Sequence, residues 1–180
     1  MTRQAALLRA VNVGGATAVA MADVRATIAD LGFEAETLLQ TGNLVFEAAK
    51  PKAAKLEALL EAAFAERLDL KTDVMVRTPA DWQALMQANP FAAVARERPS
   101  QMVVVFLKEA PGAAALAALR RAYAGPEPFE LEGRQLYVDF VAGQGRSKLT
   151  PALIERHLQV RGTARNWNTV SKIGELLLKS

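Results

Sequence analysis

Two glycine-containing turns in the first half of the sequence carry amide side chains that could hold a ligand. They read Asn12-Val13-Gly14-Gly15 and Gln40-Thr41-Gly42-Asn43. Turns of this kind bring backbone N–H groups forward, and the Asn and Gln amides add hydrogen-bond donors and acceptors, which suits a neutral polar ligand or a phosphate. The same residues also close turns through hydrogen bonds to nearby backbone, and this alternative stays open.

A third polar segment, Gly143-Gln144-Gly145-Arg146-Ser147-Lys148, lies between an expected strand and an expected helix. Glycines can form a nest of N–H groups there, and the N-terminus of the helix favours an anion. The spacing matches neither the phosphate-binding P-loop nor the dinucleotide-binding fingerprint. We therefore take Ser147 and Lys148 as candidate anion ligands, with a flexible connector that carries solvated Arg146 and Lys148 as the alternative.

The fourth candidate segment combines cations with an aromatic side chain. Arg161, Arg165 and Lys172 flank Asn166-Trp167-Asn168. A nucleic acid would use such residues for phosphate contact and base stacking. Alternatively, Trp167 anchors the core, Asn168 caps a helix and Arg165 pairs with a carboxylate inside the fold.

Positive charge is concentrated at the C-terminal end of the chain. The 180 residues carry a net charge of +3, but residues 1–79 hold nine Lys or Arg against ten Asp or Glu, and residues 80–140 hold six against seven. The last 40 residues hold seven against two. This asymmetry favours an anionic partner, unless the basic end is simply solvated.

Composition excludes several kinds of chemistry. The chain has no cysteine, which excludes disulfides, thiolate nucleophiles and iron–sulfur clusters, and its one histidine, His157, gives no basis for a histidine metal site. No apolar run approaches 18 residues, and the N-terminus lacks the pattern of a signal peptide. We therefore expect a cytoplasmic protein without membrane, metal or cofactor, and leave its oligomeric state open.

Hydrophobic patterning and turn residues predict the elements of the first half. The expected order is strand, helix, two hairpin strands, helix and strand, over residues 4–13, 21–31, 36–40, 43–48, 51–68 and 72–77. The helix that Pro51 opens should bury an apolar stripe made of Leu56, Leu59, Leu60, Ala63, Phe64 and Leu68. This order is the split βαβ, or ferredoxin-like, motif.

The second half repeats this order but ends in a helix. A short helix with Thr78 as its cap and Asp81 in its first turn buries Trp82 and precedes the repeat. The repeat is expected to contain strand, helix, two hairpin strands and two helices, over residues 102–107, 113–123, 129–132, 135–141, 151–158 and 169–177. Thr150 and Asn168 are the expected caps of the last two helices.

We therefore expect an α+β fold of two tandem ferredoxin-like subdomains with antiparallel sheets and a C-terminal helix. Residues 1–79 form the first subdomain, residues 80–100 a bridging helix and linker, and residues 101–180 the second subdomain with the basic C-terminal helical segment. In the first sheet, the strand order 4-1-3-2 places the turn at 12–15 beside the hairpin at 40–43.

Four motifs along the chain occur together, in this order and spacing, in one bacterial family. They are Leu7-Leu8-Arg9-Ala10-Val11-Asn12-Val13-Gly14-Gly15, Gln40-Thr41-Gly42-Asn43, Ser147-Lys148-Leu149 and Thr163-Ala164-Arg165-Asn166-Trp167-Asn168-Thr169. On these motifs the sequence resembles DUF1697, a domain of unknown function, from residue 3 to about residue 178. Ala10 and Thr41 stand where the family usually has glycine and serine. The resemblance implies two related ferredoxin-like halves and no established activity.

These observations give two hypotheses for function. In the first, a phosphate-bearing ligand, either nucleic acid or a nucleotide or another phosphorylated small molecule, binds through the basic C-terminal segment and the polar loops. In the second, an enzyme that uses neither metal nor cysteine acts on a small polar molecule; no catalytic residue is assigned. The candidate ligand-binding residues are Arg9, Asn12, Gly14, Gly15, Gln40, Asn43, Ser147, Lys148, Arg165, Asn166, Trp167, Asn168 and Lys172.

Overall fold

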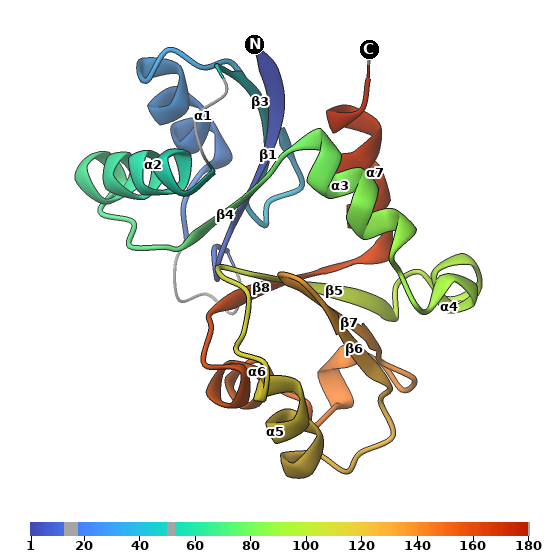
Figure 1. The fold of residues 1–180 in the computed structure, drawn as a ribbon. Coiled ribbons are helices and arrows are strands. Elements are labelled where there is room, and N and C mark those ends of the chain that lie inside the picture. Colours follow the sequence, from blue (N-terminus) through green and yellow to red (C-terminus); the bar gives the residue numbers. More distant parts are fainter. Residues whose placement is uncertain (13–17, 50–52, 180) are drawn as a thin grey trace. The chain divides into compact units, whose positions relative to one another are not determined.

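The computed structural model describes residues 1–12, 18–49 and 53–179, which form two compact units. One unit contains residues 1–84 and 172–180, and the other contains residues 85–171. Each unit has its own four-stranded antiparallel sheet (Figure 1). The subdomain boundaries drawn from the sequence divide the chain differently and stay a prediction.

The first sheet has the strand order β2-β3-β1-β4. Its strands are β1 (Thr2–Leu8), β2 (Ala35–Leu38), β3 (Asn43–Ala48) and β4 (Val74–Arg77). The central strand β1 pairs antiparallel with both neighbours, so that Ala5 lies opposite Val45 on β3 and opposite Arg77 on β4. This order confirms the 4-1-3-2 arrangement that the sequence predicts.

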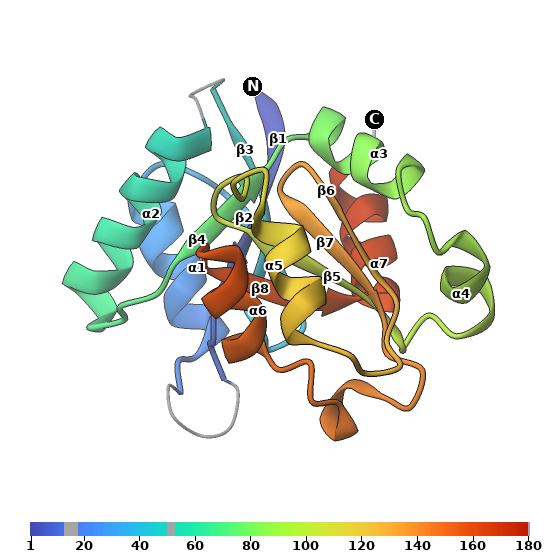
Figure 2. The same ribbon diagram turned by 60° about the horizontal axis from the view of Figure 1, so that its bottom comes forward.

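Two helices, α1 (Met21–Asp30) and α2 (Ala53–Leu68), cover one face of the first sheet (Figures 1 and 2). The apolar core between helices and sheet includes Phe46, Leu60 and Phe64, which are at most 2% exposed. Burial of one such side chain stabilises a fold by about 1.5–3 kcal/mol. The inward-facing apolar side chains of the strands and the apolar stripe of α2 therefore pack together in one core.

Carboxylates of α2 bond the backbone of the edge strand β4. Glu61 accepts a hydrogen bond from Val74 N (2.8 Å), and Glu57 accepts one from Val76 N (2.8 Å). Among the strands that the structure describes, β4 has a neighbour on one side alone, so these carboxylates satisfy N–H groups on its open side. They also fix the position of α2 along β4.

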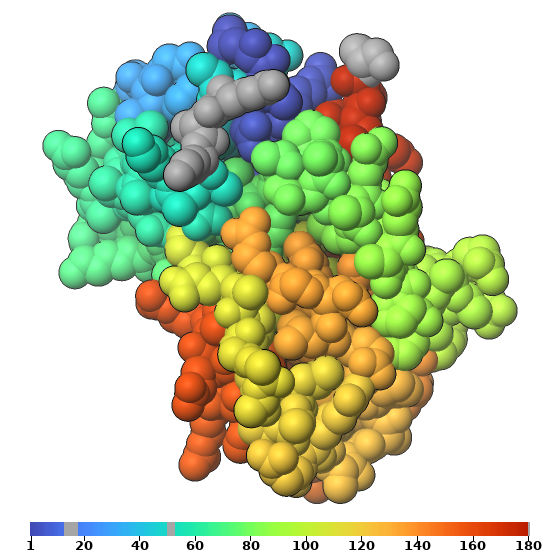
Figure 3. Space-filling model, in the orientation of Figure 1, coloured from blue at the N-terminus to red at the C-terminus, as the bar shows by residue number. Residues whose placement is uncertain are grey.

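The second unit repeats this architecture with the order β6-β7-β5-β8. Its strands are β5 (Met102–Leu107), β6 (Phe129–Glu132), β7 (Gln135–Asp139) and β8 (Gly162–Asn166). Helices α5 (Ala115–Ala122) and α6 (Pro151–Leu158) cover one face of this sheet (Figure 2). Only Leu119 of α5 is buried, and the outer side of this helix lies at the surface, in yellow in Figure 3.

Two helices, α3 (Pro79–Gln87) and α7 (Trp167–Leu177), contribute residues to both units. A short helix α4 (Ala92–Glu97) and a 3-10 turn (Gln144–Arg146) belong to the second unit. No helix that the structure describes is both long and apolar enough to cross a bilayer. The fold is therefore α+β, with two tandem ferredoxin-like subdomains and a C-terminal helix.

Two of the predicted helix caps are confirmed. Thr78 Oγ1 accepts a hydrogen bond from Asp81 N (3.1 Å), and Asp81 Oδ2 accepts one from Thr78 N (2.9 Å), which is a reciprocal capping box at the start of α3. Thr150 Oγ1 accepts a hydrogen bond from Leu153 N (3.2 Å) at the start of α6.

The sequence prediction missed β8. Its residues are Gly-Thr-Ala-Arg-Asn, and the buried positions Thr163 and Arg165 alternate with partly exposed ones. The period of two is present, but no large apolar side chain marks it. Because β8 continues to Asn166, helix α7 begins at Trp167, and Asn166 Oδ1 accepts the hydrogen bond from Thr169 N (3.1 Å). The prediction of Asn168 as the cap was therefore wrong by two positions.

One boundary and one predicted core residue of the first half also differ from the prediction. The strand β1 ends at Leu8, before Val13, because Ala10 and Asn12 both have a left-handed φ of 54°, which no extended strand contains. Leu59 of the predicted stripe is 43% exposed. Val13 and Pro51 lie outside the described residues.

Candidate functional site

The side-chain amide of Asn12 connects the end of β1 to the hairpin between β2 and β3. Asn12 Nδ2 donates to the carbonyl oxygens of Gln40 (2.7 Å) and Val19 (2.9 Å), and Asn12 Oδ1 accepts from Val19 N (2.9 Å). The predicted proximity of Asn12 to the hairpin is therefore confirmed. Gly14 and Gly15 lie outside the described residues.

Asn43 is fully buried at the start of β3. Its Nδ2 donates to the carbonyl oxygen of Leu38 (2.9 Å) and to Thr41 Oγ1 (3.1 Å), which closes the hairpin. Gly42 has a φ of +76°, and a Cβ there would lie 2.8 Å from Leu8 Cβ. The side chains of Asn43 and Thr41 thus serve turn closure, which is the alternative that the sequence leaves open.

Arg9 is half-buried and extends the pairing of β1 with β4 by one position. Arg9 N donates to the carbonyl oxygen of Asp73 (2.9 Å), and the Arg9 carbonyl accepts from Thr72 Oγ1 (2.7 Å). The backbone of Arg9 is therefore fixed by the first sheet. Gln40, on the other side of this edge, is exposed.

Ser147 attaches the segment 143–148 to the second unit. Ser147 Oγ accepts a hydrogen bond from Leu149 N (3.0 Å), and the hydroxyl also bonds to Tyr123 and Glu127. Arg146 and Lys148 are exposed. The structure thus fixes Ser147 and leaves both cations of this segment at the surface.

Glu127 is a buried carboxylate that the sequence reasoning missed. The Tyr123 hydroxyl donates to Glu127 Oε2, and a Cβ on Gly125 would collide with the Tyr123 ring. Burial raises the pKa of Tyr123, and the hydrogen bond to Glu127 raises it further. Burial alone would raise the pKa of Glu127, but hydrogen bonds from Tyr123 and Ser147 bring it below its ordinary value. This cluster stabilises the connection between α5 and β6.

Arg165 lies on β8 and is 8% exposed. Its NH1 donates to Thr163 Oγ1 (2.6 Å) and to the carbonyl oxygen of Ala164 (2.8 Å). Burial lowers the pKa of Arg165 to about 10. A buried guanidinium bonded to its own strand is the arrangement expected if Arg165 serves the fold.

The strand β8 separates Arg161 from the aromatic ring of the fourth candidate segment. Arg161 precedes β8 and Trp167 follows it, which corresponds to roughly 20 Å at about 3.3 Å per strand residue. Trp167 is half-buried, its N donates to the carbonyl oxygen of Pro99 (3.0 Å), and Asn168 is exposed. Lys172 belongs to the first unit. Arg161 and Trp167 are thus too far apart to hold the phosphate and the base of one nucleotide.

A hollow of about 560 Å³ in the second unit brings together three cations from distant parts of the sequence. It lies where the end of β5, helix α6 and the turn into β8 meet. The lining residues are Lys108, Glu109, Ala152, Glu155, Arg156, Gln159, Val160 and Arg161. Of these residues, Arg161 was singled out from the sequence, as part of the fourth candidate segment. The others were not, because no local motif connects them.

Hydrogen bonds to the backbone hold this hollow in shape. Lys108 N donates to the carbonyl oxygen of Arg161 (2.9 Å), and Gly162 N donates to Glu155 Oε1 (3.2 Å). Gln159, the C-cap of α6, has a left-handed φ of 56° and turns the chain toward β8. The cationic residues Lys108 and Arg161 are therefore adjacent in a strand ladder.

The first unit contains the same two hydrogen bonds in the same places of its fold. Arg9 N donates to the carbonyl oxygen of Asp73, and Val74 N donates to a glutamate of the second helix, Glu61. Asp73 therefore occupies in the first unit the place that Arg161 occupies in the second. An acidic side chain is compatible with this backbone arrangement, so the fold alone does not require a cation there.

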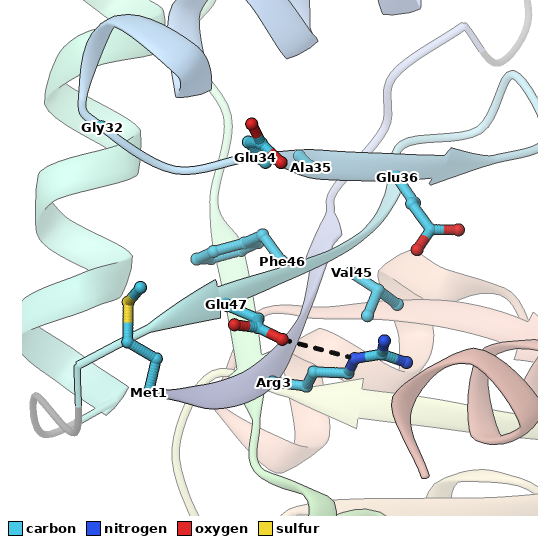
Figure 4. Close-up of a pocket in the computed structure, with 9 residues that line it drawn as sticks. All are labelled: Met1, Arg3, Gly32, Glu34, Ala35, Glu36, Val45, Phe46 and Glu47. Atoms are coloured by element: carbon cyan, nitrogen blue, oxygen red, sulfur yellow. Dashed lines mark ion pairs between the residues drawn. The ribbon is translucent and has the colours of Figure 1, made fainter. Parts of the chain in front are cut away.

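A second hollow, also about 560 Å³, lies in the first unit along β2, β3 and β1 (Figure 4). Arg3 and Glu47 form an ion pair at 3.9 Å, and Arg3 NH1 donates to the carbonyl oxygen of Leu176 (2.6 Å). Glu34 and Glu36 also line this hollow, which gives it a negative charge. Within the described part of the chain, no group of three His, Asp or Glu side chains is placed to hold a metal ion.

Comparison with known proteins agrees with the motifs and the fold. The model of a family described as protein of unknown function, DUF1697, matches residues 1–137. The solved structure of a conserved bacterial protein from Streptococcus pneumoniae is similar over 99% of this chain and 99% of that chain, with 26% identity and a TM-score of 0.74. No curated protein matches the sequence. The chain therefore belongs to the DUF1697 family.

Proposed function

We propose that the protein binds a small phosphate-bearing molecule in the hollow of the second unit, where Lys108, Arg156 and Arg161 contact the phosphate. The position of Arg161 carries this proposal. Its backbone carbonyl makes the bond that the fold needs, and the first unit makes the same bond with Asp73. The backbone arrangement accepts an acidic residue at this place, so we assign the positive charge of Arg161 to recognition of a negatively charged ligand.

The charge distribution supports an anionic ligand for the second unit. Residues 85–171 contain eleven Lys or Arg against seven Asp or Glu, whereas the rest of the chain contains eleven against twelve. Arg guanidinium and Lys ammonium groups are the side chains that bind phosphate oxygens. A volume of about 560 Å³ also falls in the range of small-molecule sites, roughly 300–1,000 Å³.

A small molecule accounts for the arrangement better than single-stranded nucleic acid. Nucleic acid binding of that kind combines phosphate contacts with bases stacked on aromatic side chains. Arg161 and Trp167 lie at opposite ends of β8, and Arg165 between them is buried. The cytoplasmic location and the enzyme hypothesis drawn from the sequence stay predictions.

Titration of inorganic phosphate, followed by amide chemical shifts of the labelled protein, tests the proposal. Arg161→Asp places the residue of the first unit at this position and is expected to keep the fold. The substitution changes the charge of the side chain beside the phosphate by two units. At a separation of about 4 Å in water, this weakens binding by about 2 kcal/mol, so phosphate affinity should fall roughly 30-fold.

Arg146→Asp is the matched control, because Arg146 is an exposed cation of the same unit that does not line the hollow. It makes the same change in net charge and should alter the affinity by less than about threefold. Equal losses in the two variants, or shifts that cluster around 143–148 and leave the hollow unchanged, would contradict the proposed site.

A further inference from the structure

We infer that the ligand of this hollow is a phosphorylated sugar or polyol, an inference that rests on the proposed function. Lys108, Arg156 and Arg161 account for a phosphate, but the hollow measures about 560 Å³. The remainder of the ligand must therefore be recognised by the other side chains of the lining. Their chemistry distinguishes a hydroxyl-rich molecule from a nucleotide.

The lining offers no surface for a nucleobase. Among the described residues that line the hollow, none is aromatic, and the uncharged ones are Ala152, Gln159 and Val160. Proteins commonly hold a base by stacking it on an aromatic ring. A purine in this hollow would contact small aliphatic side chains and the methylene groups of charged side chains, so the base should add little affinity.

The lining does offer acceptors for hydroxyl groups. Glu109 is exposed and, as a carboxylate, is an acceptor with no proton to donate. Glu155 Oε1 already accepts the hydrogen bond from Gly162 N, which leaves Glu109 as the carboxylate that we assign to the ligand. Gln159 also lines the hollow, at the C-terminal end of α6, where helices present carbonyl oxygens without helical donors.

Acceptors and cations in one hollow match a molecule with an anionic end and several O–H donors. A phosphate monoester of a sugar has both features. A carboxylate would repel inorganic phosphate, but it would attract the hydroxyls of a phosphorylated sugar. Glu109 is therefore a specificity residue: it selects for the sugar and against the bare anion.

Four probes test this inference in one calorimetric series with the intact protein. Inorganic phosphate, ribose 5-phosphate and AMP share the phosphate, and ribose lacks it. Ribose 5-phosphate should bind at least tenfold more tightly than inorganic phosphate, AMP should bind no more tightly than ribose 5-phosphate, and ribose should not bind. AMP binding more than tenfold tighter than ribose 5-phosphate would overturn the inference and leave the proposed function intact.

The variant Glu109→Ala gives an independent readout. Because Glu109 is exposed, the fold should tolerate the change. Affinity for ribose 5-phosphate should fall at least fivefold, while affinity for inorganic phosphate should stay equal or rise. Equal losses for both probes would refute the role of Glu109 in selecting the sugar. If none of the phosphate-bearing probes binds the unmodified protein, the proposed function itself fails.

Discussion

The amide nitrogen of Asn12 lies 2.7 Å from the carbonyl oxygen of Gln40, a residue 28 positions further along the chain. The same side chain makes two hydrogen bonds to the backbone of Val19. One amide thus joins the end of β1, the segment before α1 and the hairpin between β2 and β3. At this edge of the first sheet, the backbone of Val19 and the carbonyl oxygen of Gln40 are therefore bonded to the side chain of Asn12.

Replacing Asn12 should therefore destabilise the fold. Asn12→Ala loses the three hydrogen bonds. It also places alanine, which lacks the polar side chain that helps Asn adopt a left-handed conformation, at a φ of 54°. The free energy of unfolding should therefore fall by about 1–3 kcal/mol. Asn12→Gly loses the same bonds but tolerates this φ, and should be the milder change. Urea unfolding of both variants measures the difference. A glycine variant as unstable as the alanine variant would show that backbone conformation contributes nothing here.

Tyr137 should make stability depend on pH in the alkaline range. Its hydroxyl donates to the carbonyl oxygen of Leu85 (2.6 Å), and burial raises the pKa of Tyr137 to about 12. The unfolded pKa is about 10, so the stabilisation is fully present below pH 10 and is lost as the pH rises through 12. The loss should be on the order of 1–2 kcal/mol.

Denaturant unfolding between pH 9 and 12 measures this loss. Tyr137→Phe cannot ionise, and its stability should fall less steeply over the same interval. The hydrogen bond to Leu85 is absent in this variant, so it should start from a lower stability at pH 9. Parallel curves for the two proteins would refute the role of Tyr137.

Gly162 should not tolerate a side chain. A Cβ there would lie 2.9 Å from Val105 Cγ1 and 3.1 Å from the carbonyl oxygen of Phe106. Gly162→Ala should therefore lower the free energy of unfolding by about 1–3 kcal/mol, because β8 would have to move away from β5. Gly112→Ala is the control, since nothing lies within 4 Å of its Cβ position. Thermal unfolding should separate the two, with the control within about 0.5 kcal/mol of the parent.

We expect Arg165 to stabilise the fold and not to contact the ligand. Arg165→Ala removes a buried side chain and its hydrogen bond to Thr163 Oγ1, which should cost about 2–4 kcal/mol. Arg165→Met keeps most of the volume without the charge and should recover part of this loss. Unfolding curves and phosphate titrations of both variants decide the matter. Unchanged stability together with lost phosphate binding would make Arg165 a ligand contact instead.

Much of the fold was predictable because its signals are local. Strands such as β5 are continuous apolar runs, the Thr78 and Asp81 cap is a four-residue pattern, and Gly42 marks a hairpin. The strand β8 was not predictable in this way, since its buried positions are Thr163 and Arg165. Pairing with β5 places polar side chains where a sequence pattern would lead one to expect apolar ones.

The candidate site was harder to predict than the fold. The amides of Asn12 and Asn43 have types suited to ligand binding, yet the structure uses both for turn closure. Lys108 and Arg161 come together because Lys108 N bonds the Arg161 carbonyl across β5 and β8. Since β8 itself had no apolar signal, neither the ladder nor the hollow beside it could be derived from the sequence.

The shared hydrogen bonds of the two units suggest a history for the chain. In both ladders an arginine of the last strand, Arg77 or Arg165, sits opposite the same position of the central strand, three residues before its final leucine. The two halves share their strand register but few side chains. This combination is expected when one ancestral half is duplicated and the two copies then diverge. One copy then carries Asp73 where the other carries Arg161, so the side chain at this position has changed its charge while the backbone hydrogen bond has stayed the same.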